Sequence, residues 1–347
     1  MEETYEAMDK GRLPGREEEV KAARKTFSRL GGVYVIGTIV IYAAQLVPTL
    51  LVRFLKPEWL TDANIVLTLS MLPMYLIGMP VLIMLVKRIP GQVPERHGMK
   101  AGHFIVAAIM CYAIVYITNI LGNIITAVIG MLKGSAVPNV LLDATSSVNM
   151  WLMAVYMVIC APIMEEYVFR KLIVDKTVRY GQGVAVMVSG LMFGLFHGNL
   201  NQFVYAFVLG LFLAFLYVKT GNLKITIALH MMINFVGGIV SSWLMRMIDL
   251  TEYEELMQKM DWKGMTVYVQ HNLTGILAYA AFSLFVFGMM IAGGILLIVC
   301  LAKKKFVCDK EKAVIPRGQK FRTVILNVGM LIYVLFWTVM IIAQLFM

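Results

Sequence analysis

Charged residues are scarce in this chain of 347 residues. Aspartate, glutamate, lysine and arginine together make up 15% of it, whereas about a quarter of the residues in a typical soluble domain are charged. Hydrophobic residues make up 60%, and the mean hydropathy is +0.77. These values exclude an ordinary soluble domain and indicate an integral membrane protein.

Other absences narrow the fold class. Transmembrane barrels show ten-residue segments of alternating hydrophobicity, and the chain has no such alternation. The four cysteines have no paired spacing, which argues against a disulfide framework or a cysteine zinc site. No internal repeat or low-complexity linker divides the chain. We therefore predict an all-α fold, a polytopic transmembrane helical bundle.

The apolar segments predict about eight or nine spans. A membrane helix needs about 20 apolar residues to cross a hydrocarbon core of roughly 30 Å. The predicted spans are 31–52, 64–86, 102–132, 147–169, 184–199, 203–218, 225–246, 273–301 and 323–346. The spans in the middle are short and polar residues cluster in them, so we expect a compact core of short helices there.

The basic excess follows the predicted topology. If the N-terminus is cytoplasmic, 25 of the 31 lysines and arginines fall in inside segments, as the positive-inside rule requires. No aromatic residues interleave with the basic runs, so we expect no nucleic-acid partner. The Lys303-Lys304-Lys305 run suits anionic lipid at the bilayer surface. We expect a multi-pass protein of the cell membrane, in the manner of a bacterial plasma membrane, with a cytoplasmic N-terminus.

Four regions are predicted along the chain. They are a cytoplasmic N-terminal segment (1–30), N-terminal transmembrane helices (31–146), a central core (147–246), and an extracytoplasmic loop with C-terminal transmembrane helices (247–347). Within the first region, Glu17–Leu30 suits a helix that lies at the membrane surface.

Two adjacent glutamates close the apolar run that starts near Val148. A carboxylate in a bilayer costs about 2.5–3.5 kcal/mol on insertion scales and usually marks function. Glu166 and Arg170 are four residues apart, so they share one helix face and can pair. Glu165 points about 100° away and is left without that partner. The alternative is that both glutamates merely end a span and reach into the headgroups.

Further polar residues lie on the next apolar segments. His197 stands inside an otherwise apolar helix, and His230 and Asn234 are four residues apart on another. Each alone is more typical of a satisfied hydrogen bond in the core, but polar groups on three successive helices suggest one chamber. With a turn at Gly181, Glu165 and His197 lie at nearly one depth, since each residue rises 1.5 Å.

Small residues line the helix that carries His197. Gly190, Gly194 and Gly198 form a stripe that lets helices approach closely. Packing explains most of this pattern. We expect the close approach to bring His197 within reach of Glu165.

Together these residues resemble the CPBP family, which comprises type II CAAX prenyl proteases and bacteriocin-processing or self-immunity proteins. The resemblance spans roughly residues 147–240. Its motifs are Glu165-Glu166-Tyr167-Val168-Phe169-Arg170, Phe193 to His197, and His230 to Asn234. Each motif is short, but their order and membrane setting are fairly specific.

The resemblance implies an intramembrane endopeptidase of the glutamate type that acts on a peptide or protein at the membrane and needs no cofactor. The resemblance also implies that Glu165 and His197 activate a water. His230 and Asn234 form an oxyanion hole, and the supporting residues are Glu166, Arg170 and Phe193. These roles suit the residue types, because a partly desolvated glutamate is a stronger base.

Two alternatives use the same residues. Glu165, His197 and His230 have the ligand types of a catalytic Zn2+ site, although the His-Glu-x-x-His signature is absent. A scaffold or a transporter is the other alternative, because membrane-buried charges also build proton relays. No corresponding polar pair in the outer spans suggests the inverted repeats of a transporter.

Overall fold

The computed structural model describes residues 14–139, 147–309 and 314–346. The predicted segment 1–30 therefore lies partly outside the described residues. The prediction of a separate surface helix over Glu17–Leu30 is wrong, because a single helix, α2, runs from Pro14 to Leu55. The charged segment continues into the first span without a break.

Within the described residues, eight helices are long and apolar enough to cross a membrane, and the fold is the predicted all-α transmembrane bundle. The first half of the chain comprises α2 (Pro14–Leu55), η1 (Pro57–Thr61), α3 (Ala63–Pro73), η2 (Met74–Gly78), α4 (Met79–Lys87) and α5 (Ala101–Lys133). The central part comprises α7 (Met150–Met153), η3 (Ala154–Cys160), α8 (Ala161–Glu165), η4 (Glu166–Leu172), α9 (Ile173–Thr177), η5 (Val178–Tyr180), α10 (Gln182–Phe196), α11 (Leu200–Thr220), α12 (Leu223–Asn234), η6 (Phe235–Val240) and α13 (Ser241–Met245). The last part comprises α14 (Leu250–Lys259), α15 (Trp262–His271), α16 (Leu273–Ala302), η7 (Arg317–Gln319), α17 (Lys320–Val324) and α18 (Val328–Leu345). The predicted span 184–199 corresponds to α10, which is a shorter apolar helix (Gln182–Phe196) and is not among these eight.

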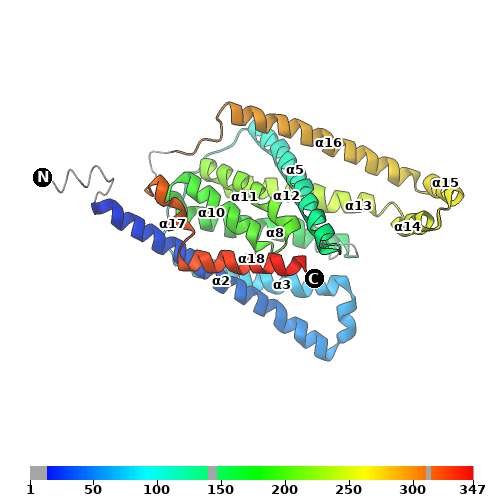
Figure 1. The fold of residues 1–347 in the computed structure, drawn as a ribbon, viewed down its shortest axis with the longest axis horizontal. Helices are drawn as coiled ribbons and strands as arrows, with labels where there is room; N and C mark the ends of the chain where they lie inside the picture. The colour runs from blue at the N-terminus through cyan, green and yellow to red at the C-terminus, as the bar shows by residue number, and fades with distance from the viewer. Residues whose placement is uncertain (1–13, 140–146, 310–313, 347) are drawn as a thin grey trace.

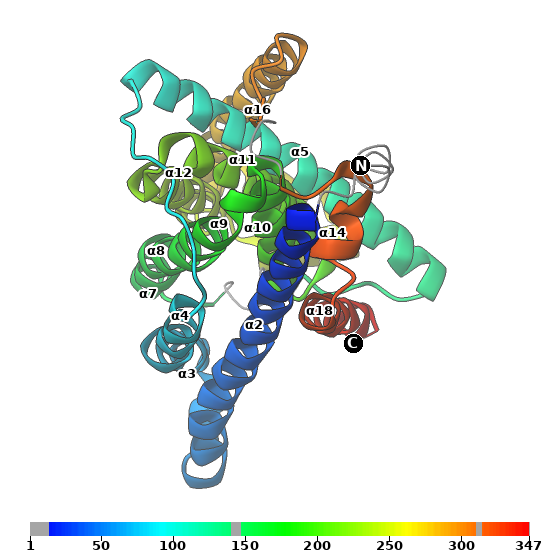
Figure 2. The ribbon, with the colours of Figure 1, turned by 90° about the vertical axis from the view of Figure 1, so that its left-hand side faces the viewer.

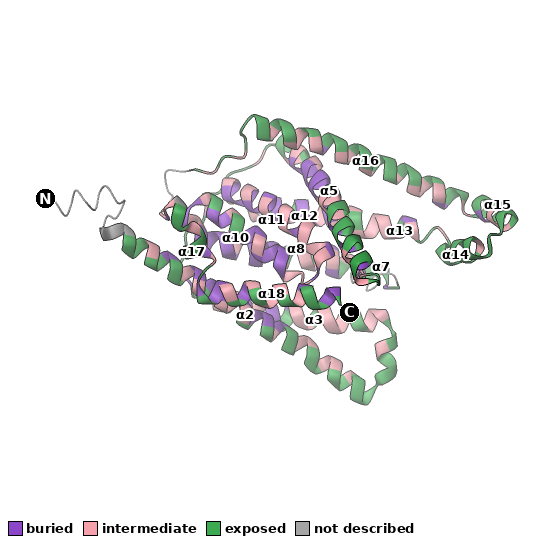
Figure 3. Cartoon of the chain, in the orientation of Figure 1, coloured by how far each residue is buried: buried purple, intermediate pink, exposed green. Residues whose placement is uncertain are grey.

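The central helices form the core of the bundle. Helices α8, α10, α11 and α12 lie together, with α2 and α18 along one side and α5 and α16 along the other (Figures 1 and 2). Burial follows this order, since purple residues gather on the central helices (Figure 3). Of the most apolar stretch of α11, 56% is buried, against 6% for α16. Helix α16 thus has few fully buried residues, although Gly293 packs closely on Ile109 of α5.

The helix from Met150 to Tyr180 widens on both sides of Pro162. Elements η3 and η4 are π-helical, and proline removes a backbone donor between them. Wide turns of this kind are frequent at functional sites. In η4 the carbonyl oxygen of Val168 accepts from the Tyr34 hydroxyl (2.6 Å), and that of Phe169 accepts from the Ser189 hydroxyl (2.7 Å). Neighbouring helices thus hydrogen-bond to the backbone of the turn that carries Glu166.

Glycines set the two turns of the core. Gly181, with φ of 129°, ends the helix that carries the glutamates, at the predicted position. Gly221, with φ of 56°, separates α11 from α12. Both angles lie in the region that L-residues with a side chain rarely adopt.

The glycine stripe packs α10 against α11 rather than against the helix of Glu165. A Cβ atom on Gly190 would lie 2.9 Å from the backbone nitrogen of Leu211. A Cβ atom on Gly194 would lie 3.0 Å from the Cα atom of Phe207. Close packing was correctly predicted, but Gly190 and Gly194 face α11 and not the helix of Glu165. The predicted approach of His197 to Glu165 stays a prediction.

The region 247–272, expected to be a loop, contains two short helices. Asp249 accepts from the backbone nitrogen of Glu252 (3.0 Å), and Asp261 accepts from that of Gly264 (2.9 Å). These aspartates begin α14 and α15 by satisfying N-terminal donors that have no partner within the helix.

We predict that Gly190→Ala destabilises the bundle by about 1–3 kcal/mol, because the new methyl group meets backbone that cannot yield. Gly288→Ala in α16 is the matched control, since no atom lies within 4 Å of its Cβ position. Thermal unfolding in detergent measures both. An unfolding temperature of Gly190→Ala equal to or above that of the control would contradict the packing described here.

Candidate active site

The two adjacent glutamates have different surroundings. The side chains of Glu166 and Arg170 are both fully buried, and Arg170 Nη2 lies 3.0 Å from Glu166 Oε1. The side chain of Glu165 is 18% exposed and makes no hydrogen bond with the described residues. The predicted pairing of Glu166 with Arg170 is confirmed, although these residues lie in a π-helical turn. Glu165 is left as the free carboxylate.

The ion pair between Glu166 and Arg170 is stabilised by the attraction of the two charges and by the contact of Arg170 with an aromatic ring. Arg170 Nε and Nη1 and Glu166 Oε2 have no hydrogen-bond partner among the described residues. The guanidinium carbon of Arg170 instead lies 4.1 Å from the ring centroid of Phe193, a cation–π contact that gains strength when desolvated. Arg170 and Glu166 therefore depend on each other, because a buried charge without its partner is strongly unfavourable.

His230 connects the two glutamates. Its Nδ1 lies 2.9 Å from Glu166 Oε1, and its Nε2 lies 3.8 Å from Glu165 Oε2. A carboxylate only accepts hydrogen bonds, so Nδ1 carries a proton and donates it to Glu166. Nε2 then donates toward Glu165 only when the imidazole is protonated. His230 thus lies between the two carboxylates and contacts both.

His197 has a fixed tautomer. Its Nδ1 lies 2.9 Å from the carbonyl oxygen of Phe193, and a carbonyl only accepts, so Nδ1 is protonated. Nε2 is then an acceptor. The Phe193 ring meets the ring of His197 edge to face at 4.8 Å and that of His230 at 5.9 Å. The Phe193 ring therefore contacts His197, His230 and Arg170 at once.

Asn234 lies at the end of α12, one turn beyond His230. Its Nδ2 donates to the carbonyl oxygen of Met157 (2.8 Å), which leaves the second amide proton for another acceptor. His230 and Asn234 thus both contact the helix of the glutamates, as expected for residues four apart on one face.

Glu165, His197 and His230 have the ligand types of a zinc site, but the structure does not bring the three side chains close enough to share one ion. Glu165 and His230 approach each other, whereas His197 makes no contact with Glu165. Among the described residues, no group of three histidine, cysteine, aspartate or glutamate side chains is placed to bind a metal ion.

Sequence reasoning missed a polar row that follows His197. Asn199, Gln202 and Tyr205 recur every third residue and form successive hydrogen bonds. The Tyr205 ring lies 6.5 Å from that of His197. Polar residues at this spacing on one face of an otherwise apolar helix were the signal that could have found it.

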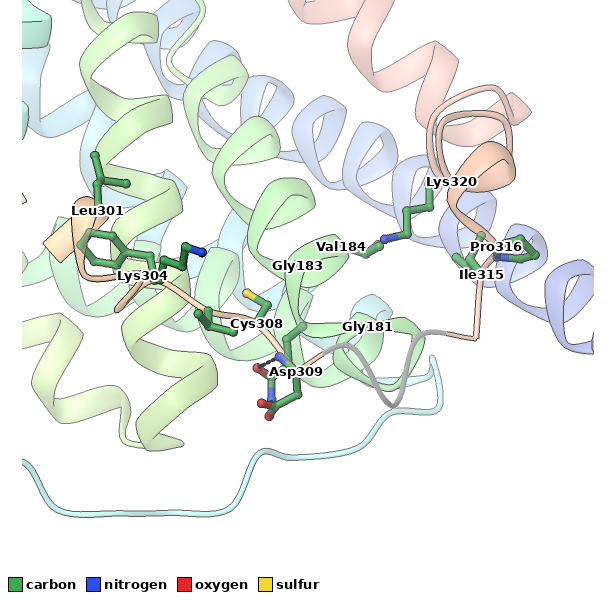
Figure 4. Close-up of a pocket in the computed structure, with 13 residues that line it drawn as sticks. Gly181, Gly183, Val184, Leu301, Lys304, Cys308, Asp309, Ile315, Pro316 and Lys320 are labelled. Atoms are coloured by element: carbon green, nitrogen blue, oxygen red, sulfur yellow. Dashed lines mark hydrogen bonds between the residues drawn. The ribbon is translucent and has the colours of Figure 1, made fainter. Parts of the chain in front are cut away.

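A cavity of about 660 Å³ lies away from these residues, near the start of α10. Lys304 and Lys320 stand on its opposite sides (Figure 4). Its lining contains none of the predicted site residues, so it belongs to a different part of the surface.

We predict that Arg170→Gln destabilises the protein by about 3–5 kcal/mol, because it leaves Glu166 buried and unpaired. Lys259→Gln is the control: it removes the same i,i+4 pairing from exposed Glu255 and should cost less than about 1 kcal/mol. Chemical unfolding monitored by tryptophan fluorescence compares them. Equal losses in the two variants would contradict the structural role of Arg170.

Comparisons with known proteins cover the same helices. A family model described as "Type II CAAX prenyl endopeptidase Rce1-like" matches residues 147–236. The chain is 30% identical over 161 residues to "Putative membrane peptidase YdiL" of Bacillus subtilis (strain 168). That match covers 44% of this chain and 64% of the relative, so less than two thirds of the relative's length is represented. No solved structure matches the chain.

The matched segment contains both glutamates, Arg170, both site histidines and Asn234. Residues 147–236 of this multi-pass membrane protein are therefore similar to the Rce1-like family, in the same segment that carries the resemblance to the CPBP family.

Proposed function

We propose that the protein is an intramembrane endopeptidase that hydrolyses peptide bonds of a membrane-associated peptide or protein. One observation carries the proposal. Glu165 presents a free carboxylate beside His230, while Glu166 is held by Arg170 and by the same histidine. Adjacent carboxylates in different environments suit one base and one positioning group.

Glu165 acts as the general base in this proposal. A water donates one proton to Glu165 as its oxygen attacks the carbonyl carbon of the peptide, and Nε2 of His197 accepts the other water hydrogen as a hydrogen bond. The tetrahedral intermediate then collapses, the C–N bond breaks, and Glu165 returns the proton to the leaving nitrogen. The products are a carboxylic acid and an amine, the acid then ionises by releasing its proton to the amine or to water, and no covalent enzyme intermediate is required.

The oxyanion of the intermediate needs hydrogen-bond donors. Asn234 offers its second amide proton, and a protonated His230 offers Nε2–H. Such donors are strong in a site that excludes water. Glu166 orients the His230 ring through the Nδ1 hydrogen bond, so it acts through the histidine and not on the substrate.

The substrate is proposed from the site's position. The glutamates lie on a membrane-length helix, so a substrate peptide has to be held in or at the bilayer. A bacterial peptide precursor or a membrane protein fits this setting, and a prenylated peptide is the alternative suggested by the family description. With the N-terminus cytoplasmic, as the distribution of lysine and arginine favours, entry would be from the cytoplasmic face.

Purified protein in detergent, with a library of membrane-associated peptides, tests this function. We expect cleavage by the wild type, loss of at least about 100-fold in Glu165→Gln, and retention in chelator. Glu255→Gln on the exposed α14 serves as the control for a lost surface carboxylate. Unchanged cleavage by Glu165→Gln would refute the site, and cleavage by no sample would favour the scaffold or transporter.

Treatment with a chelator separates the two protease mechanisms. Zinc, where bound, would lower the pKa of a bound water, with Glu165, His197 and His230 as its ligands. Because the described geometry does not bring these three together, we propose the metal-free mechanism. Loss of cleavage in chelator, with recovery on added zinc, would overturn it.

We also predict that Asn234→Ala lowers kcat by about 100-fold and changes KM little, because its spare amide proton is proposed to act mainly in the transition state. Steady-state kinetics on the best library peptide measure both constants. A rise in KM with kcat unchanged would instead make Asn234 a substrate-binding residue.

A further inference from the structure

Three polar side chains on or next to α11 form a row that ends beside His197. Asn199 Nδ2 donates to the backbone carbonyl oxygen of His197 (2.9 Å) and to Gln202 Oε1 (2.7 Å). Gln202 Nε2 donates to the hydroxyl oxygen of Tyr205 (3.0 Å). The row lies within the matched family segment, but the three motifs of the resemblance do not include it.

The direction of every hydrogen bond in this row is determined by its first member. Asn199 caps α11, and its Oδ1 accepts from the backbone N–H of Gln202 (2.9 Å). The other terminal atom of Asn199 is therefore the amide nitrogen, which can only donate. The Gln202 atom that it meets must be the oxygen, so the Gln202 atom that meets Tyr205 is the nitrogen.

The Tyr205 hydroxyl oxygen consequently accepts, and its own proton points elsewhere. Among the described residues, no group accepts that proton. Tyr205 is partly buried, and its ring lies edge to face with that of His197, with 6.5 Å between the ring centroids. A neutral donor without an acceptor among the described residues thus lies beside His197, which is proposed to hold the attacking water.

This donor supplies what the other site residues offer only in part. His230 donates at Nε2 only when it is protonated, and Asn234 spends one of its two amide protons on Met157. The attacking water needs acceptors, which Glu165 and His197 provide, and a donor to that water would weaken it as a nucleophile. A free donor beside His197 is therefore better suited to the substrate's carbonyl oxygen.

We infer that Tyr205 is a further catalytic residue, whose hydroxyl donates a hydrogen bond to the carbonyl oxygen of the scissile bond as it becomes an oxyanion. Gln202 is the positioning residue that orients this hydroxyl. The inference rests on the proposed endopeptidase function.

Kinetics on the best-cleaved library peptide test it first. Tyr205→Phe should lower kcat about 100-fold with KM within about twofold, the effect of removing one oxyanion donor in another protease. Gln202→Met should lower kcat about tenfold. The double variant should have the same kcat as Tyr205→Phe, because Gln202 has no hydroxyl left to orient. Tyr116→Phe, on α5 and stacked on Tyr112, is the control and should cleave like the wild type.

A second arm does not depend on turnover. A pool of hydrophobic peptide aldehydes, whose hydrates resemble the tetrahedral intermediate, should bind Tyr205→Phe about tenfold more weakly than the wild type. The parent peptides should bind both equally. Unfolding temperatures show that each variant is folded.

The outcomes separate the two claims. Wild-type cleavage together with an unaffected Tyr205→Phe overturns the role of Tyr205 and keeps the protease. Absence of cleavage with aldehyde binding that depends on Tyr205 overturns the protease and keeps the donor. Absence of both cleavage and aldehyde binding overturns both, and additive losses in the double variant overturn the orienting role of Gln202.

Discussion

The buried ion pair between Glu166 and Arg170 is the constraint on which the rest of the site depends. Both side chains are fully buried, where a lone charge would be strongly destabilising. Arg170 packs on Phe193, and Phe193 in turn contacts the rings of His197 and His230. Glu166 also accepts from His230. One pair therefore links the helix of the glutamates to α10 and α12, and leaves Glu165 as the carboxylate without a fixed partner.

The surrounding fold supports this arrangement through the backbone. Pro162 and the two π-helical turns widen the helix at the glutamates, and Tyr34 and Ser189 bind the carbonyl oxygens of the second turn. Close packing of α10 on α11 places the polar row of α11 beside His197. The outer helices α2 and α18 add buried residues to the core, whereas only 6% of the most apolar stretch of α16 is buried (Figure 3).

The spacing of residues along the chain predicted the membrane helices and one ion pair, but it could not predict contacts between residues far apart in the sequence. Hydropathy predicted the bundle because each span must bury its own backbone polar groups. The four-residue spacing predicted the pairing of Glu166 with Arg170. Nothing local reveals that His230 meets Glu166 across 64 positions, or that the glycine stripe faces α11. The helices α14 and α15 were missed because they are mainly polar, and their capping aspartates were read as loop residues.

The central claim is that the two adjacent carboxylates have different roles: Glu165 is the catalytic base, and Glu166 stabilises the site through its ion pair with Arg170. Parallel measurement of cleavage and unfolding for the isosteric variants Glu165→Gln and Glu166→Gln tests it most directly. The account predicts that Glu165→Gln loses cleavage at wild-type stability, whereas Glu166→Gln unfolds at a clearly lower temperature because Arg170 is left buried without its counter-charge. A Glu165→Gln variant that cleaves normally, or a Glu166→Gln variant of wild-type stability, would contradict it.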